Sequence, residues 1–237
     1  MIDQAARQRI ADNWNSVVEE VHGAASDCGR DPSSVHVIGV SKYVDAELTS
    51  ALVAAGCHQL GESRPQLLWQ KAEEMEAAES IEWHMIGHLQ RNKVRRLLRY
   101  RPLVHSIDSE RILRAIADEA SQQGQEIDVL LEVNISGDES KTGLTSAQLV
   151  AVLESLPEAG VVVRGLMAMA GWGTDRADAK RHFEQTRDLR DRVQDSTGVQ
   201  LPELSMGMSG DFREAIEAGA TMVRIGSRLF EGLIDRS

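Results

Sequence analysis

Apolar residues along this 237-residue chain follow two periodicities that alternate. Between Ile2 and Ser26 they recur every three or four positions, with Ile10, Trp14 and Val17 on one face, which predicts an amphipathic helix. Beyond residue 32, short apolar runs of strand length alternate with helical stretches. Eight of these runs are predicted to be strands: Val35–Ser41, His58–Gly61, Glu82–Gly87, Leu103–Ile107, Ile127–Asn134, Val161–Ala168, Glu203–Met206 and Thr221–Ile225.

The order of these elements predicts the fold. Strands rich in Val and Ile, each followed by a helix, form a parallel sheet that helices cover. Eight repeats favour an α/β fold closed into a single (β/α)8 barrel, which typically needs about 250 residues. Only a short tail follows the last strand, so we expect the N-terminal helix to cover the gap left by the missing eighth helix. An open, doubly wound sheet is the competing architecture.

Local signals support the helical stretches, and nothing divides the chain. Thr145 and Gln148 form a capping-box pattern, in which two side chains satisfy the free amides of a helix start. We find no linker or composition break, so residues 1–237 are expected to form one domain.

Composition narrows the class of partner. The apolar fraction of 42% is enough for one large core, and the net charge of −11 argues against binding to nucleic acid or to acidic membranes. Cys28 and Cys57 form no CxxC pair, so neither a disulfide framework nor a thiolate metal site is expected. The chain shows no signal-peptide core and no apolar run of about 20 residues. These features predict a soluble, cytoplasmic protein.

Lys42 ends the first predicted strand. In barrels, functional groups lie at the C-terminal ends of strands. A partly desolvated lysine at such an end presents a nucleophilic amine that can condense with an aldehyde. A solvated lysine just beyond a strand has the same sequence signature, so the other strand ends must decide between the two.

The last two predicted strands end in segments rich in glycine and serine, Ser205–Ser209 and Val223–Ser227. Glycine lets backbone amides approach a ligand closely, and serine hydroxyls donate to anions. Barrels often bind phosphate in the loops after strands seven and eight. If the barrel closes, strand eight lies beside strand one, and both segments become neighbours of Lys42. An amine next to a phosphate cradle suits a phosphorylated aldehyde cofactor, with Arg224 on either its phosphate or its ring nitrogen.

Five segments, in order along nearly the whole chain, resemble the YggS/PROSC family of pyridoxal phosphate homeostasis proteins. They are Val40-Ser-Lys42, Gly61-Glu62, Trp83–Gly87 with Leu89-Gln90 and Asn92-Lys93, Ser205–Ser209 with Asp211, and Val223–Gly226. The departures from the family pattern are local: Ser63 stands for a usual Asn, Arg64 for an aromatic residue, His88 for Pro and Arg91 for Ser.

The resemblance implies a barrel similar to the N-terminal domain of bacterial alanine racemase, without that enzyme's second domain. It implies that Lys42 carries pyridoxal 5'-phosphate (PLP) as a Schiff base, and that the protein takes part in PLP homeostasis and delivery without turning over a substrate. PLP-requiring apo-enzymes are the expected recipients, and we expect a monomer or a weak dimer. The residues implied around the cofactor, besides the lysine, are Ser205, Met208, Ser209, Arg224, Gly226 and Ser227.

Two enzyme classes remain as alternatives. A PLP-dependent amino-acid racemase or lyase would use Lys42 together with an acid/base partner. The only tyrosines are Tyr43, which directly follows the lysine, and Tyr100, at the end of a basic helix, so neither is an obvious partner. A barrel enzyme acting on a sugar phosphate would instead use the lysine for an aldol Schiff base. We therefore assign no catalytic residue.

Two further signals are weighed against simpler explanations. His84 and His88 straddle a strand end about 13 Å apart, too far to share one metal ion, so no metal site is expected. Lys141, in the segment after the fifth strand, is a rival aldehyde acceptor or a second, transient PLP site. The basic run at residues 91–101 is interpreted as a solvated helix face rather than a partner site.

Overall fold

The computed structural model describes residues 2–76, 78–135, 142–171, 173 and 175–234. The strands are β1 His36–Val40, β2 Gln59–Glu62, β3 Glu82–Met85, β4 Leu103–Ile107, β5 Ile127–Glu132, β6 Val161–Met167, β7 Glu203–Met208 and β8 Met222–Ile225. The α-helices are α1 Gln4–Asp27, α2 Ala46–Ala54, α3 Pro65–Glu74, α4 Arg91–Leu97, α5 Glu110–Gln122, α6 Ser146–Glu154, α7 Arg176–Thr197 and α8 Phe212–Glu217. Short 3-10 helices are η1 Pro32–Ser34, η2 Ala78–Ser80 and η3 Leu98–Tyr100.

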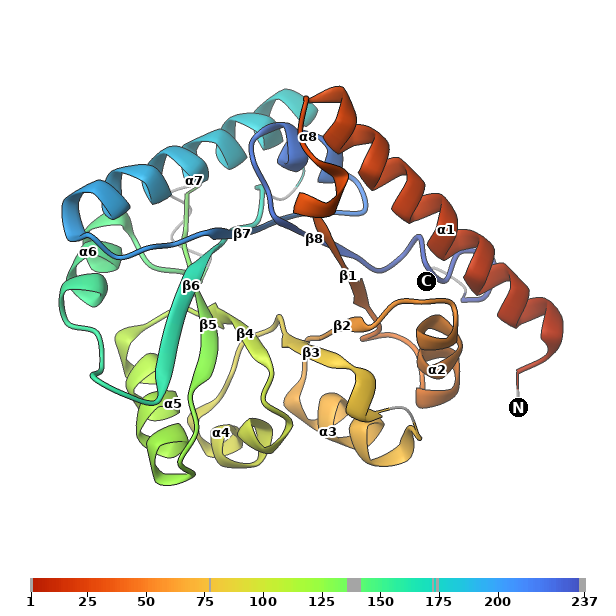
Figure 1. Cartoon of the computed structure of the whole chain (residues 1–237), viewed down its shortest axis with the longest axis horizontal. Helices are drawn as coiled ribbons and strands as arrows, with labels where there is room; N and C mark the ends of the chain where they lie inside the picture. The colour runs from red at the N-terminus through yellow and green to blue at the C-terminus, as the bar shows by residue number, and fades with distance from the viewer. Residues whose placement is uncertain (1, 77, 136–141, 172, 174, 235–237) are drawn as a thin grey trace.

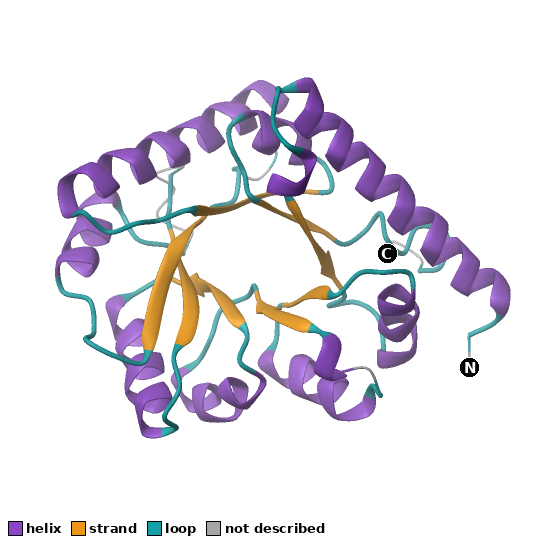
Figure 2. Cartoon of the chain, in the orientation of Figure 1, coloured by secondary structure: helices purple, strands orange, loops and turns teal. Residues whose placement is uncertain are grey.

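The strands form a closed parallel barrel, which confirms the predicted architecture. Strand β8 pairs with β1 from His36 opposite Met222 to Gly39 opposite Ile225, so the competing open sheet is wrong. Figure 2 shows the ring of strands inside a ring of helices. Each of β1 to β7 is followed by an α-helix, and no α-helix follows β8 within the described residues.

Strand ends differ from the predicted ones where the sheet is irregular. Strand β7 continues two residues beyond its predicted end, because its pairing with β8 shifts register between Ser205 and Met208. Strand β5 stops at Glu132 instead of Asn134, whose amide donates to the carbonyl of Leu144 instead. The predicted capping box at Thr145 is confirmed at the start of α6.

Helix α1 covers the gap left after β8, as predicted. It packs against α2 and α8 along one side of the barrel (Figure 1). The Asn13 side-chain amide donates to the carbonyls of Leu229 and Glu231, both at 3.2 Å, and Glu20 forms an ion pair with Arg228. The first helix therefore fastens the segment that follows the last strand.

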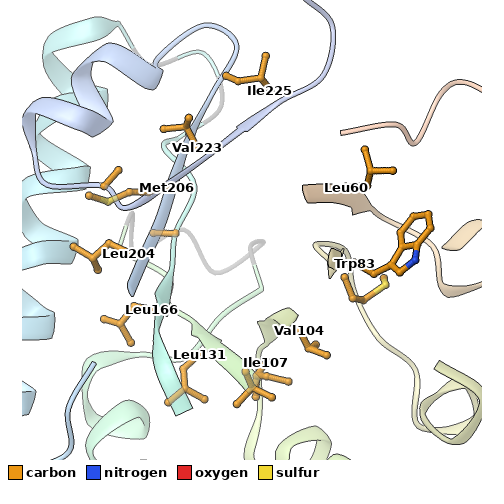
Figure 3. Close-up of a cluster of buried hydrophobic side chains, with 14 of the residues drawn as sticks. Leu60, Trp83, Val104, Ile107, Leu131, Leu166, Leu204, Met206, Val223 and Ile225 are labelled. Atoms are coloured by element: carbon orange, nitrogen blue, oxygen red, sulfur yellow. The ribbon is translucent and has the colours of Figure 1, made fainter. Parts of the chain in front are cut away.

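Most of the hydrophobic core lies between the strands and the helices. Figure 3 shows part of this layer, with side chains such as Leu60, Val104 and Leu204 along the strands. A second, smaller cluster consists of Ile38, Leu130, Met167 and Met222 with Leu103 packed against it. Strand side chains alternate between the two faces of a sheet, so alternate residues of each strand point outward to the helices and inward to the barrel interior.

Two expectations from composition can be compared with the structure. Cys28 is exposed, Cys57 is buried, and both are free thiols. Across the part of the chain that the structure describes, helices with the length and apolarity needed to cross a membrane are absent.

Candidate functional site

Strand β1 brings Lys42 to the C-terminal rim of the barrel. The amide of Ser41 donates to the carbonyl of Gly61 at 3.1 Å, which continues the sheet pairing one residue past the strand. Lys42 is partly exposed, and its Nζ lies 4.9 Å from the ring centroid of Tyr43. The amine makes no hydrogen bond to a described residue, so it is available to a ligand at the rim.

A buried ion pair supports the backbone just before Lys42. Lys71 of α3 is 4% exposed, and its Nζ lies 2.5 Å from Glu62 Oε1 and 2.7 Å from the carbonyl oxygen of Ser41. The Ser41 hydroxyl donates to the same Glu62 oxygen at 2.7 Å. The hydroxyl and the carbonyl of Ser41 are thus held by buried charges, which fixes where Lys42 leaves the strand.

The loops after β7 and β8 touch the end of β1. The amide of Gly226 donates to Ser209 Oγ at 3.3 Å, so the two loops are joined to each other. A Cβ placed on Gly226 would lie 3.2 Å from Val40 Cβ and 3.3 Å from its carbonyl oxygen, tighter than most real contacts. Glycine at this position therefore permits the close approach that brings the β8 loop beside Lys42.

Gly207 shapes the end of β7. Its φ of +88° lies in the left-handed region that glycine adopts readily, and a Cβ there would meet Ala215 Cβ at 2.5 Å. The next residue, Met208, is exposed, and its amide donates to Asp211 Oδ1 at 2.6 Å. The turn therefore exposes Met208 and Ser209 at the rim.

Arg224 of β8 lies below this rim and is 5% exposed. Its Nη1 donates to Ser205 Oγ at 2.6 Å, and its Nη2 donates to the carbonyl of Ala168 at 3.0 Å. Burial lowers the pKa of Arg224 to about 10, so the guanidinium is still charged at neutral pH. A guanidinium has five N–H donors. Those left over can serve a ligand above it.

A chain of hydrogen bonds continues from Arg224 through the barrel interior. Ser205 Oγ lies 2.8 Å from His105 Nδ1, and His105 Nε2 lies 2.9 Å from His84 Nδ1. Burial lowers the pKa of His84 to about 3, and it lowers that of His105 well below the usual value. Both imidazoles are therefore neutral at pH 7. We call His84, His105, Ser205 and Arg224 the interior chain.

Two carboxylates, Glu132 and Asp211, lie near Arg224, the end of the interior chain that is closest to the rim. Burial raises the pKa of Glu132, which accepts a hydrogen bond from the Thr142 hydroxyl at 2.6 Å, and burial likewise raises that of Asp211. Nearer the surface, His88 Nδ1 lies 2.9 Å from Asp108 Oδ2. Because His88 follows β3 and Asp108 follows β4, this pair lies on the same face of the barrel as Lys42.

The structure brings most of the predicted site residues to one rim. Lys42, Met208, Ser209, Gly226 and Ser227 all lie at the C-terminal ends of β1, β7 and β8. Ser205 and Arg224 lie beneath them, where Ser205 contacts Arg224 and His105 instead of facing the rim. Lys141 lies outside the described residues. Among the residues described, no group of three or more His, Cys, Asp or Glu side chains is arranged to hold a metal ion.

Sequence reasoning missed two residues of the site. Lys71 falls three positions after Leu68 on the buried stripe of α3, and a charge inside such a stripe is the signal that was overlooked. His105 lies between Val104 and Ser106 in a stretch of β4 that is buried throughout, and a histidine inside such a strand was the available sign that it needs a partner within the barrel. Neither signal names the partner, which only barrel closure supplies.

Comparison with known proteins agrees with the barrel fold described above. Residues 7–233 match the family model described as alanine racemase, N-terminal domain. The pyridoxal phosphate homeostasis protein of Aquifex aeolicus is 38% identical, over 90% of this chain and 94% of that one. The protein of the same name from Escherichia coli K12 is 33% identical, over 93% and 95%.

Solved structures give two further likenesses. The structure of PipY from Synechococcus elongatus with PLP bound has a TM-score of 0.84 at 32% identity, covering 93% of this chain and 99% of that one. Alanine racemase from Corynebacterium glutamicum has a TM-score of 0.74 at 16% identity and covers 97% of this chain but 63% of the enzyme. The second likeness concerns the fold alone.

Proposed function

The chain belongs to the family of the alanine racemase N-terminal domain, together with the pyridoxal phosphate homeostasis proteins, and we propose that it binds PLP on Lys42. The observation that carries this proposal is the junction of β8 with β1. It sets a free lysine amine beside two loops rich in glycine and serine, above a buried guanidinium. The relatives' shared name supports a role in intracellular PLP homeostasis.

The residues present fit the chemistry of PLP. Its phosphate needs hydroxyl and amide donors, and Ser209, Ser227 and the backbone around Gly226 supply them on the rim. Its aldehyde needs an amine, and Lys42 Nζ has no described hydrogen-bond partner that would compete. Gly226 leaves room next to Val40 that any Cβ would fill. Met208, 43% exposed beside these groups, offers an apolar surface to the ring.

Arg224 is assigned to the ring nitrogen rather than to the phosphate. Its two Nη atoms are turned inward to Ser205 and Ala168, away from the serine loops. A buried cation that can only donate hydrogen bonds leaves a facing pyridine nitrogen unprotonated, which weakens the ring as an electron sink. That electronic state suits a protein that holds PLP and does not use it for carbanion chemistry.

PLP, when bound, supplies an aldehyde carbon that forms a Schiff base. Lys42 Nζ would be the amine that holds this carbon, with water as the other product of the condensation. The Lys71–Glu62 pair holds Ser41 and therefore the direction of the lysine. The partly exposed position of Lys42 leaves the bond open to exchange with another amine, as delivery to a second protein requires.

We further propose that the whole chain acts as one PLP-binding domain that delivers PLP to apo-enzymes in the cytoplasm, as a monomer or weak dimer, without substrate turnover. Neither tyrosine is poised as an acid/base partner. Tyr43 is 78% exposed, and the Tyr100 hydroxyl donates to Glu73 at 2.7 Å, where its ring also lines a cavity at the other end of the barrel.

A PLP-dependent racemase or lyase is the second candidate. The observation that favours it is the His88–Asp108 pair, which offers an imidazole on the face that carries Lys42. The His88 side chain is 61% exposed, and its hydrogen-bond partner Asp108 is 14% exposed. We rank this function second, because a solvated imidazole controls a proton less tightly than a buried one.

Borohydride reduction of the PLP-loaded protein, followed by peptide mass mapping, tests the proposal. We expect the phosphopyridoxyl adduct on Lys42 and its loss in Lys42→Ala, while Lys180→Ala on the outer helix α7 keeps it. An adduct on Lys141 in the wild type would overturn the assignment. Exchange of α-hydrogens of amino acids for solvent deuterium, well above the rate with free PLP and lost in His88→Ala, would establish the enzyme instead.

A further inference from the structure

The interior chain crosses the barrel from one end to the other. Its four side chains come from β3, β4, β7 and β8, and all four are buried. Arg224 lies below the rim, and His84 lines a cavity of about 620 Å³ at the N-terminal end. Met222, two positions before Arg224 on β8, faces the same side of the sheet and belongs to a small apolar cluster. Buried polar groups cost free energy unless they are paired, so a polar chain beside apolar packing calls for a reason other than stability.

Arg224 is the charged member of this chain, and its partners are neutral. Within the described part of the protein it donates to the Ser205 hydroxyl and to the Ala168 carbonyl, and to no carboxylate. Asp211 and Glu132 act on it electrostatically without a hydrogen bond. A buried cation without an ion pair depends on the neutral groups around it for its position. Two of its five N–H groups are used in these bonds, and three are left for a ligand.

The direction of the hydrogen bonds follows from Arg224. A guanidinium can only donate, so Ser205 Oγ accepts from Nη1, and the Ser205 hydroxyl must donate elsewhere. Among the described residues, the acceptor within its reach is His105 Nδ1, at 2.8 Å. Burial lowers the pKa of His105, so its imidazole carries a single proton, which lies on Nε2 and is donated to His84 Nδ1. A proton on His105 Nδ1 would instead set two donors against Ser205 and leave its hydroxyl without an acceptor.

We propose that His105 is a positioning residue of the PLP site: its Nδ1 accepts the Ser205 hydroxyl and thereby leaves Ser205 Oγ to hold Arg224 opposite the pyridine nitrogen. This role rests on the proposed function, in which Arg224 faces the ring nitrogen of bound PLP. Without an acceptor at position 105, the Ser205 hydroxyl turns to another atom, and Arg224 Nη1 loses the oxygen that holds it. The carboxylates of Asp211 and Glu132 then draw the guanidinium away from the ring.

NMR of the full-length protein, loaded with PLP that carries nitrogen-15 in its ring, tests this role, because the resonance of a pyridine nitrogen moves strongly on protonation. In the wild type, Arg224 should keep this resonance at the unprotonated position between about pH 8 and pH 6. In His105→Leu the midpoint of protonation should lie about one pH unit or more higher, because a nearby cation has moved away. Asp211 and Glu132, the carboxylates that act on Arg224, are common to both proteins.

His105→Asn is the matched control. Its Oδ1 takes the place of Nδ1 and accepts the Ser205 hydroxyl, so the midpoint should stay at the wild-type value. Ser205→Ala should raise the midpoint as His105→Leu does, and the double variant should raise it no further, because His105 acts through Ser205. A merely structural role predicts instead that His105→Leu and His105→Asn both lose stability and leave the midpoint unchanged.

A second measurement needs neither a folded variant at position 205 nor PLP. NMR of the imidazole nitrogens in the unloaded wild type should show His105, assigned by the absence of its signal in His105→Asn, with a proton on Nε2 alone at neutral pH. A proton on Nδ1 would overturn the proposal, as would equal midpoints in wild type and His105→Leu, or a protonated ring nitrogen in the wild type. In each of these cases a borohydride adduct on Lys42 still supports the PLP site. If no adduct forms on Lys42, the proposed function fails and this role fails with it.

Discussion

The two ends of the barrel are built differently, one mainly from backbone and the other mainly from side chains. At the C-terminal end, the candidate site consists of backbone loops, with Gly207 and Gly226 admitting close contacts, and of Lys42, which we propose as its reactive group. At the N-terminal end, the cavity is lined by side chains of the strand starts, above a buried imidazole. The interior chain connects the two. The comparison teaches that a site made of backbone leaves a motif in the sequence, whereas a site made of side chains from many strands does not.

Removing one charge from below the C-terminal end is expected to have the largest effect on stability. Lys71→Met leaves the Glu62 carboxylate buried without its cation, because Glu62 is 0% exposed and Lys71 4%. Breaking a buried ion pair by removing one partner typically costs about 3–5 kcal/mol. We expect a loss of that size in the free energy of unfolding, measured by urea denaturation, together with weaker PLP binding.

The double variant Glu62→Gln/Lys71→Met is the control for this prediction. It removes both charges, so it should recover much of the stability lost in Lys71→Met alone. A single variant that loses less than about 1 kcal/mol would mean that the buried pair contributes little to the C-terminal end.

Gly207→Ala tests the backbone conformation at the same end, and we expect it to have the next largest effect on the free energy of unfolding. The left-handed φ of +88° and the close approach of Ala215 both oppose a Cβ. Backbone strain of this kind costs about 1–3 kcal/mol. We expect a loss of about 2 kcal/mol in unfolding free energy, again by urea denaturation, and reduced PLP affinity because the β7 loop must move.

Gly23→Ala supplies the matched comparison. Gly23 lies within α1, four residues before its end, and a Cβ there meets nothing within 4 Å. The same substitution should stabilise the protein there by about 0.5–1 kcal/mol. If Gly207→Ala were equally harmless, the claim that the C-terminal site is shaped by backbone would be wrong.

The interior chain at the other end predicts a dependence on pH. Burial holds the pKa of His84 at about 3, while a histidine in the unfolded chain titrates near about 6.5. Below that value the unfolded state binds a proton that the native state does not, so stability falls as the pH drops from about 6.5 towards 3. His105 adds to the same trend, because its pKa is also lowered by burial.

The expected slope is about 1 kcal/mol per pH unit for each neutral buried histidine. Unfolding free energies of wild type and His84→Asn, compared between about pH 7 and pH 5, isolate the contribution of His84, because Glu132 and Asp211 are common to both. The variant should show the shallower slope. Parallel curves would indicate that His84 titrates alike in the native and unfolded states, so that its burial does not lower its pKa.

The sequence predicted the barrel and the C-terminal end in some detail. The alternating helix and strand periodicities, the short strands and the missing last helix each left a local signal. The glycine- and serine-rich segments at the ends of β7 and β8 predicted an anion-binding site in the loops that follow these strands. Closure then placed those loops beside Lys42 without further information. Strand ends were less exact, because the shift between Ser205 and Met208 depends on pairing that no single segment encodes.

The supports of the site and the whole N-terminal end were not predictable in the same way. Lys71 and Glu62 meet because α3 folds back on β2, and His84 meets His105 because β3 and β4 are neighbours. The family resemblance implies that Ser205 lies around the cofactor, which stays a prediction, but it gave no sign that the Ser205 hydroxyl lies 2.8 Å from His105 Nδ1. Which of two alternate residues faces inward depends on the register of the closed sheet.

The junction of β8 with β1 also bears on how the protein is made. Lys42 emerges early in synthesis, whereas Arg224 and the loop containing Gly226 emerge after seven strands have already been translated. A nascent or truncated chain that lacks β8 has the amine but not the groups placed opposite it. Such a chain has no closed sheet, so the loop that follows β8 comes to lie beside the end of β1 only once translation of the last strand is complete.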